Sequence, residues 1–297
     1  MAAVAPVRVT SVLESEEMKA LLRRSDLRGA WTVLSNWTLI GVALALVAVW
    51  PHPATVIPAL VLLGNRQLGL AVLMHDCGHR ALFRRERLNL VVGRWLCAAP
   101  VFADLDRYFA KHQKHHRDAG SHEDPDLASY EPYAVSRQSF RRKVLRDLTG
   151  RTGVKQLAQT ARTGGLPVLW RPLLVNAALF AIVALLGKPW LYVLWLVAWL
   201  TTNMLFARLR LAAEHAVVPD LFDPDPRSHT RTTLARWWER LLFAPNKVNY
   251  HLEHHLLPSV PPYRLPELHR LLRARGFYDR AEIVVGYPKV LGKLTVA

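Results

Sequence analysis

The chain has 297 residues, of which 51% are hydrophobic, and a formal net charge of +16. Its two cysteines, Cys77 and Cys97, are too few for a disulfide framework or a four-cysteine zinc site. The basic residues fall between long apolar runs, which is typical of membrane proteins that keep positive charge on one side of the bilayer. We therefore expect an integral membrane protein without a nucleic-acid partner.

The N-terminal segment, residues 1–30, precedes the first apolar run. It carries acidic residues and no apolar core near its start, so a signal peptide is not expected. The pattern Ser11-Val-Leu-Glu14 predicts instead a short capped helix that leads toward the membrane.

Four later segments are long enough to cross about 30 Å of hydrocarbon at about 1.5 Å per residue. These predicted transmembrane helices are residues 31–50, 53–74, 168–187 and 190–207. Very short turns rich in proline and glycine separate the first pair and the second pair, so the spans should form two hairpins.

A further apolar stretch, residues 88–102, is interrupted by Gly93, Arg94 and Pro100. It is too short and too broken for a regular span, and we expect an interfacial or re-entrant segment.

The distribution of lysine and arginine predicts the orientation. Residues 1–30 carry 5 of them, residues 80–165 carry 17 and residues 208–297 carry 14. Both termini and the two long polar regions, 75–167 and 208–297, should therefore be cytoplasmic. The predicted fold is all-α, a single membrane domain over residues 1–297 in which four transmembrane helices carry a cytoplasmic helical cap. The richness in alanine, leucine and arginine points to a bacterial inner membrane.

The histidines are concentrated in the predicted cap. An HxxxH motif directly follows the second span, and two HxxHH motifs lie further along the chain. On a helix, positions i, i+3 and i+4 share one face, where neutral imidazoles can converge on iron, copper, zinc or nickel. A further histidine lies about two turns beyond the fourth span. The nine candidate ligands are His75, His79, His112, His115, His116, His215, His251, His254 and His255.

Nine nitrogen donors exceed the needs of one ion, so two ions are expected. Carboxylates beside the ligands could accept hydrogen bonds from the imidazole nitrogens that do not bind metal. These candidates are Asp76, Glu214, Glu253 and Asp126. The isolated histidines His52, His229 and His269 are expected to have no role in the site, whereas His122 is close enough to support it.

The polar run Asn65-Arg66-Gln67 interrupts the second predicted span. Polar groups at that depth usually face the protein interior. They either line a substrate cavity or pair with another helix.

The sequences around these motifs resemble those of the integral-membrane fatty acid desaturase superfamily. The relevant stretches are LMHDCGHRALF at 73–83, HQKHHRDAGSHEDPD at 112–126 and VNYHLEHHLLPSVPPYRLPELHRLL at 248–272. The likeness covers roughly residues 30–290 and is nearest to the bacterial and sphingolipid-type branches, including the group that contains dihydrorhizobitoxine desaturase.

The resemblance implies two iron ions held by the nine histidines, with O2 as co-substrate. It implies an acyl-lipid or acyl-carrier substrate, and an external ferredoxin or cytochrome b5-type electron donor. Some relatives add an asparagine one turn before the histidine that follows the fourth span. Here that position is Leu211, so the chain departs from the pattern at one of the two ions.

The leading interpretation is a desaturase that introduces a carbon–carbon double bond into an acyl or acyl-like chain. A di-iron hydroxylase uses the same ligands, so the motifs leave both reactions open. A metal transporter or sensor would need ionisable residues along the spans, and these spans offer little beyond Arg66 and Arg171. A zinc hydrolase would leave several histidines unused.

Overall fold

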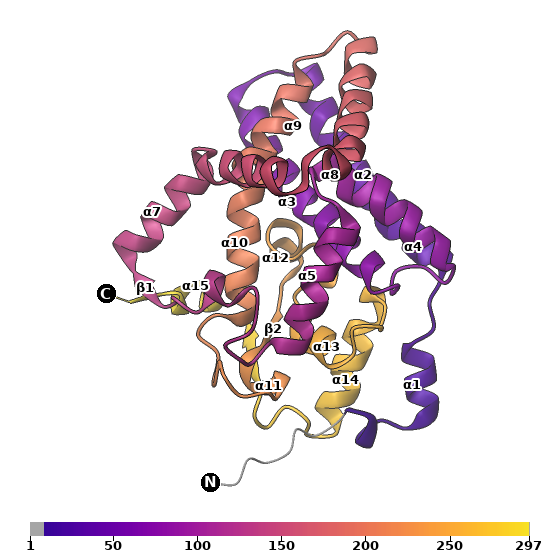
Figure 1. Ribbon diagram of the computed structural model, residues 1–297, viewed down its shortest axis with the longest axis vertical. Coiled ribbons are helices and arrows are strands. Elements are labelled where there is room, and N and C mark those ends of the chain that lie inside the picture. The colour runs from indigo at the N-terminus through magenta and orange to yellow at the C-terminus, as the bar shows by residue number, and fades with distance from the viewer. Residues whose placement is uncertain (1–8, 297) are drawn as a thin grey trace.

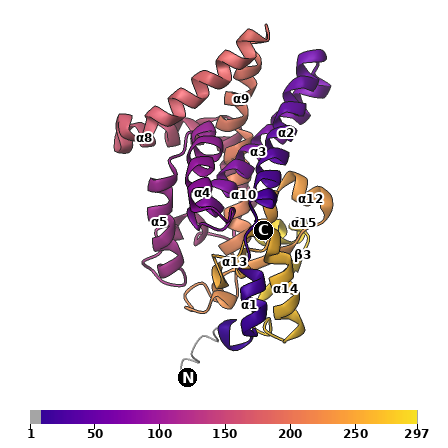
Figure 2. The same cartoon turned by 90° about the vertical axis from the view of Figure 1, so that its right-hand side faces the viewer.

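The computed structural model describes residues 9–296, and it is predominantly helical. Long helices form the upper part of the molecule in Figure 1, and shorter elements gather below them. The turned view in Figure 2 shows α2, α8 and α9 reaching away from the cluster formed by α1, α13 and α14. Residues 1–8 of the N-terminal segment, on which part of the signal-peptide argument depends, lie outside the described residues.

Within the described chain, four helices are long and apolar enough to span a membrane. They are α2 (Asp26–Val49), α3 (Pro53–Gly78), α8 (Arg151–Leu185) and the run Leu191–His215, which comprises α9 (Leu191–Leu200) and α10 (Thr202–His215). The number of apolar spans is as predicted. Their bounds differ from the prediction because each helix continues past its apolar part, so that α3 ends four residues later and α8 begins 17 residues earlier than expected.

Local chemistry explains how the first two of these helices begin. The Ser25 hydroxyl accepts the backbone N–H of Arg28, 3.3 Å away, at the start of α2. Pro53 supplies the first residue of α3, and the His52 imidazole accepts the Ala54 N–H at 3.2 Å.

The second pair of long helices is broken. Gly165 in α8 has φ 56° and ψ −157°, a conformation that glycine adopts readily, and Pro167 follows it. The helix therefore bends there before it runs upward in Figure 1. Thr201, at φ −118° and ψ −84°, separates α9 from α10.

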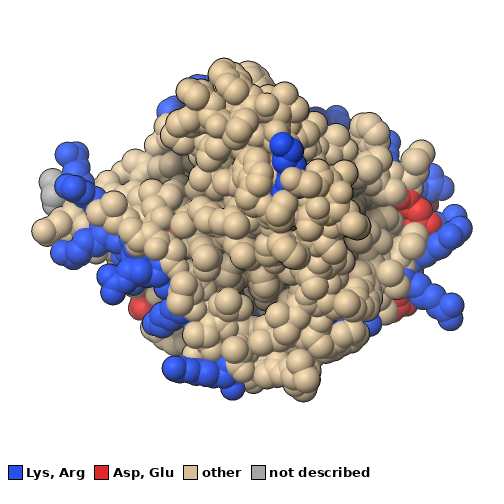
Figure 3. All heavy atoms as spheres, turned by 90° about the horizontal axis from the view of Figure 1, so that it is seen from above, with Lys and Arg blue, Asp and Glu red and all other residues tan. Residues whose placement is uncertain are grey.

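The long helices present apolar side chains outward. Exposed examples on α2 and α8 are Trp31, Leu34, Leu173 and Leu185. Figure 3 shows the upper face as almost entirely uncharged, with lysine and arginine around its edge. Such a surface suits lipid.

The core of the apolar part lies where α2, α3 and α9 meet. Buried side chains there include Ile40, Leu63, Leu70, Trp195 and Trp199. α3 is the central helix, since 61% of the residues in its 18-residue apolar segment are buried inside the protein.

The interrupted stretch at 88–102 forms no regular span. It comprises α4 (Glu86–Val92), the π-helix η2 (Gly93–Ala98) and the 3-10 helix η3 (Ala99–Val101), and α5 (Leu105–Asp118) follows after a 95° bend. Phe102, with φ 56°, lies at the bend. The Asn176 amide of α8 donates to the Ala99 carbonyl at 3.1 Å, which fastens this segment to a spanning helix.

Short elements complete the lower part. The helical ones are η1 (Val9–Ser11), α1 (Ser15–Leu21), α6 (Leu127–Tyr130), α7 (Arg137–Leu148), α11 (Pro226–His229), α12 (Trp237–Leu242), η4 (Pro245–Lys247), α13 (His251–Leu256), η5 (Pro262–Arg264), α14 (Leu265–Ala274) and α15 (Tyr287–Lys293). The helix expected to be capped by Ser11 begins at Ser15 instead. There the Glu17 carboxylate accepts the Glu14 backbone N–H at 2.9 Å.

The all-α prediction missed four short strands. β1 (Val135–Ser136) pairs in parallel with β4 (Thr295–Val296), and β2 (Arg231–Leu234) pairs in parallel with β3 (Glu282–Val285). Runs of two to four residues are too short to show a strand periodicity. The fully buried Arg231 joins β2 to β3 through Glu282, 2.5 Å away, and to the end of α10 through the Ala213 and Ala216 carbonyls.

Candidate metal centre

Four elements bring the nine predicted histidines together. α3 carries His75 in its last turn and is followed at once by His79, and α10 ends at His215. α5 supplies His112, His115 and His116, and α13 supplies His251, His254 and His255. Helical spacing at i, i+3 and i+4 turns each triplet toward the same region.

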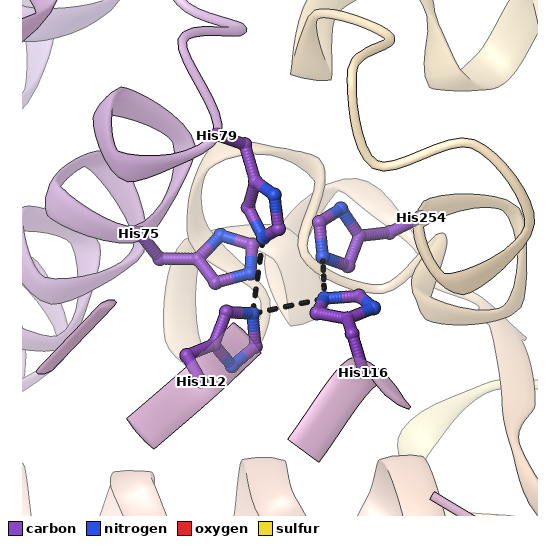
Figure 4. Close-up of side chains that lie close together, drawn as sticks. All are labelled: His75, His79, His112, His116 and His254. Carbon is purple, nitrogen blue, oxygen red and sulfur yellow. Dashed lines mark hydrogen bonds between the residues drawn. The ribbon is translucent and has the colours of Figure 1, made fainter. Parts of the chain in front are cut away.

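The histidines form two separate groups. The first consists of His75, His79, His112, His116 and His254, whose nitrogens lie within 4.8 Å of one another. Figure 4 shows the five rings pointing inward from α3, α5 and the C-terminal region. The Nε2 of His116 lies 2.9 Å from that of His112 and 3.0 Å from that of His254.

The second group consists of His115, His215, His251 and His255, again with nitrogens within 4.8 Å of one another. The Nε2 of His251 lies 2.8 Å from that of His215 and 3.1 Å from that of His255. Each of the nine predicted ligands thus belongs to one group, and none belongs to both.

Burial favours the neutral form of several of these imidazoles. Six of the nine are buried, while His79, His116 and His255 keep partial contact with solvent. Burial lowers the pKa of His79 to about 4 and that of His116 to about 2, and it lowers the pKa of His112 and His254 well below the usual value. Neutral imidazole is the form that binds metal.

The donor arrangement fits metal ions. The Nε2 of His112 lies 3.1 Å from the Nε2 of His79 and 2.9 Å from that of His116. A neutral imidazole carries a proton on only one nitrogen, so hydrogen bonds alone cannot pair all the nitrogens that face one another here. The Nε2 of His75 is buried and has no hydrogen-bond partner among the described residues. A cation among these nitrogens would satisfy them all, and two groups of imidazoles accommodate two ions.

Carboxylates orient several of the rings from behind. The Nδ1 of His75 lies 2.9 Å from Asp76 Oδ1, and the Nδ1 of His115 lies 2.9 Å from Asp124 Oδ1. Burial alone would raise the pKa of Asp124, but hydrogen bonds from His115 and Tyr130 lower it. Glu214 differs from the prediction. One of its oxygens lies 3.6 Å from His251 Nε2, the nitrogen that faces His215 and His255, and the other oxygen accepts from Arg210.

The two remaining predicted carboxylates contact other groups. Asp126 pairs with Lys111 at 2.5 Å, and Asp124, two residues earlier, is the one that reaches a ligand. Glu253 accepts from Thr232 and Tyr278 and lies 2.6 Å from His269 Nδ1, so it fixes α13 without touching a ligand ring. The sequence signal for Asp124 was its place in the same acidic loop.

The isolated histidines differ in their placement. His52 lies at the start of α3, and His122 stacks on Phe222 with ring centroids 4.1 Å apart. His269 is buried against Glu253. His229 is buried beside the second group, with its ring centroid 6.0 Å from that of His255.

The polar run in α3 pairs with neighbouring elements. The Asn65 and Arg66 side chains donate to the backbone carbonyls of Leu242 and Leu241 in α12, and the Gln67 amide donates to the Trp195 carbonyl at 2.9 Å. These contacts give the three side chains partners within the protein and join α3 to α12 and α9.

A separate cavity of about 240 Å³ adjoins the first histidine group. Its lining is mostly apolar and includes Leu68, Val72, Met204 and Ala207 from α3 and α10, together with Tyr108. Polar side chains also line it, namely Gln156, Asn203 and Arg210. The Tyr108 ring stacks on the His112 ring with centroids 5.4 Å apart, so this residue of the cavity wall contacts the first histidine group.

Comparison with known proteins gives consistent results. Over 279 residues, the chain is 25% identical to dihydrorhizobitoxine desaturase of Bradyrhizobium elkanii, covering 84% of this chain and 76% of the relative. It is 28% identical over 261 residues to a β-carotene ketolase from a Paracoccus strain, covering 82% and 94%. It is 26% identical over 271 residues to an sn-1 oleoyl-lipid 12-desaturase from a Picosynechococcus strain, covering 80% and 74%.

A family model described as fatty acid desaturase matches residues 51–286, which include both histidine groups. Members of this family are oxidoreductases, generally with two irons and dependent on O2. With its histidine groups and apolar helices, the chain belongs to the fatty acid desaturase family.

Proposed function

We propose that the protein is an O2-dependent desaturase that introduces a carbon–carbon double bond into an acyl or acyl-like chain. The observation that carries this proposal is the convergence of nine histidines into one group of five and one of four beside a largely apolar cavity. The nine histidines would hold two iron ions. Iron with O2 supplies an oxidant strong enough to remove hydrogen from an unactivated CH2 group, which no protein side chain can do.

The chain's own residues position the reaction. The carboxylates of Asp76 and Asp124 hold the His75 and His115 rings so that their other nitrogens face the centre. The largely apolar lining of the cavity favours a hydrocarbon segment, and Gln156, Asn203 and Arg210 offer polar contacts within it. The Tyr108 ring, stacked on His112, forms the wall between that segment and the first histidine group.

An oxygen-adding reaction is the second candidate. The β-carotene ketolases among the relatives support it, because a hydroxylase or ketolase adds oxygen to carbon where a desaturase removes two hydrogens. The same histidines serve either outcome.

The interpretation as a transporter or sensor has weaker support. Within the described spans, Arg66 is held by the Leu241 carbonyl and Arg171 pairs with Asp104 at 3.4 Å, so these charges form local contacts. A zinc hydrolase would need only part of the nine donors.

The setting completes the proposal. We place both termini and the histidine groups on the cytoplasmic side of a bacterial inner membrane, with α2–α3 and α8–α9 as hairpins of a single domain over residues 1–297. The excess of lysine and arginine in the segments outside the spans supports this orientation. Two electrons per turnover would come from an external ferredoxin or cytochrome b5-type protein. The basic segments of this chain would attract such a donor if the donor is acidic.

Product analysis tests the proposed function. Lipids and metabolites from cells with and without the protein are compared by mass spectrometry, with the His254→Ala variant as the inactive control. Desaturation predicts a product lighter by two hydrogens, and oxygen addition predicts a heavier one. No product difference between wild type and His254→Ala across lipids and small metabolites would reject both reactions.

A further inference from the structure

The two histidine groups are unequal. The first contains five imidazoles and the second contains four. Ions such as iron accept five or six donors, so the second group has more room for an additional donor from the protein. Any such donor must lie beside His115, His215, His251 or His255.

His229, the last residue of α11, lies at this place. It is 3% exposed, and its ring centroid is 6.0 Å from that of His255, with the ring planes at 81°. Its backbone carbonyl also accepts a hydrogen bond from His215 Nδ1, 3.3 Å away. The residue therefore touches two of the four histidines of the second group, one through its backbone and one through its ring.

The surrounding contacts hold His229 in position. The Asp225 carboxylate accepts the Arg227 backbone N–H at the start of α11 and also pairs with the Arg227 guanidinium at 2.5 Å. The Thr230 hydroxyl donates to the Pro226 carbonyl at 2.6 Å. Because Arg227 and Asp225 are both buried, this short helix is anchored from inside the protein.

The hydrogen bonding of the ring fixes its protonation. The Nδ1 of His229 lies 2.8 Å from the Asp223 backbone carbonyl, and a carbonyl only accepts, so Nδ1 carries the proton. The lone pair of the neutral ring is then on Nε2. That atom is buried and has no hydrogen-bond partner among the described residues, a condition that costs free energy unless something occupies the space beside it.

We propose that His229 is a tenth histidine of the metal centre, and that its bare Nε2 serves the ion held by His115, His215, His251 and His255 across one water molecule. This inference rests on the proposed two-ion site. A water is required because His229 lies outside the set of four whose nitrogens are within 4.8 Å of one another. A water bound to the ion would donate a hydrogen bond to His229 Nε2, and this bond would fix the orientation of the water.

The proposal is tested by measuring metal binding to the 297-residue protein purified in detergent. Wild type, His229→Phe and His229→Gln are loaded anaerobically with 57Fe(II), the two ions are resolved by Mössbauer spectroscopy, and their removal by a chelator is followed. His229→Phe keeps a ring of similar size but has no nitrogen, so a role in packing alone is preserved. His229→Gln restores an acceptor oxygen.

The expected result is selective. In His229→Phe, one ion binds about 10–100-fold more weakly, and its spectrum changes while the other ion is unaffected. Retention of the unaffected ion shows that the protein is folded. His229→Gln recovers part of the lost affinity.

A matched control is His269→Phe, which replaces another buried histidine whose Nδ1 is bonded and whose Nε2 has no partner among the described residues. This change should leave the ratio of the two affinities as in wild type. If His229→Phe retains both ions with wild-type spectra, or weakens both equally, the assignment of His229 is wrong and the two-ion site stands. If wild type binds fewer than two ions, the two-ion site itself is wrong, and this inference falls with it.

Discussion

His115 and His116 are adjacent in sequence, yet their imidazoles serve different histidine groups. The His116 Nε2 lies 3.0 Å from that of His254 in the group of five, whereas the His115 ring packs against the His215 ring of the group of four at 4.9 Å between centroids. α5 therefore lies between the two proposed ions, and a rotation of this helix would disturb both. Neighbouring side chains on a helix differ by about 100° in direction, which makes the arrangement possible.

The first prediction concerns His254, which contacts His116 in the group of five. His254→Ala should lower the iron content from about two ions per chain to about one and abolish product, because its imidazole is one of the five donors. Metal analysis of purified protein and product analysis by mass spectrometry check both effects. His122→Ala removes a histidine that stacks on Phe222 and should leave iron content near wild type. Two ions and full activity in His254→Ala would contradict the site.

The second prediction compares two aspartates in the same loop. Asp124→Asn weakens the hydrogen bond that orients His115, so the ion of the group of four should bind about 10–100-fold more weakly. Asp126→Asn removes only an outer ion pair with Lys111, whose net contribution is about 0–1 kcal/mol, and should leave affinity unchanged. Chelator competition measures both. Equal effects of the two substitutions would show that Asp124 does not orient its histidine.

The third prediction concerns pH. Burial holds the folded pKa of His79 at about 4, whereas an unfolded histidine titrates near 6.5. Between these values the unfolded chain binds more protons than the folded one. The metal-free protein should therefore lose stability as the pH falls from 6.5 toward 4, by about 1.4 kcal/mol per pH unit for each such histidine.

Thermal melts of the metal-free protein between pH 7.5 and pH 4.5 check this prediction. Burial also lowers the pKa of His112 and of His254, so their effects on stability should add to that of His79. A melting temperature that rises on acidification would have the wrong sign for buried neutral imidazoles.

The fourth prediction concerns the cavity. Ala207→Phe places a ring among its lining residues and should reduce product formation at least tenfold while the iron content stays near two, because the chain segment is displaced and the ligands are not. Ala178→Phe makes the same change on an exposed face of α8 and should retain activity. Product yield per bound iron separates the two variants. Full activity in Ala207→Phe would place the substrate elsewhere.

The sequence predicted the parts of this protein that have a strong periodic signal. Four apolar runs were long enough to identify the spans. The HxxxH and HxxHH spacings identified eight of the nine histidines that gather in the two groups, and the position of His215 after the fourth span identified the ninth. The motif resemblance gave the family, which the match over residues 51–286 confirms.

Contacts between segments that are distant in the chain could not be predicted from the sequence. The parallel pairing of Arg231 with Glu282 joins residues 51 positions apart, and nothing in either short strand indicates its partner. His229 looked isolated because its neighbours in space, His215 and His255, are 14 and 26 positions away. Asp124 and Asp126 are equivalent as sequence, and only the path of the loop decides which one reaches His115.

The uneven exposure of the ligands has a consequence for how ions come and go. His79, His116 and His255 are the three that keep contact with solvent, and their rings are neighbours, with His116 centred 4.9 Å from His79 and 4.4 Å from His255. The two histidine groups are therefore most accessible to solvent at these three neighbouring rings. Because His79 and His116 belong to the group of five and His255 to the group of four, a substitution that covers these rings should slow the exchange of both ions.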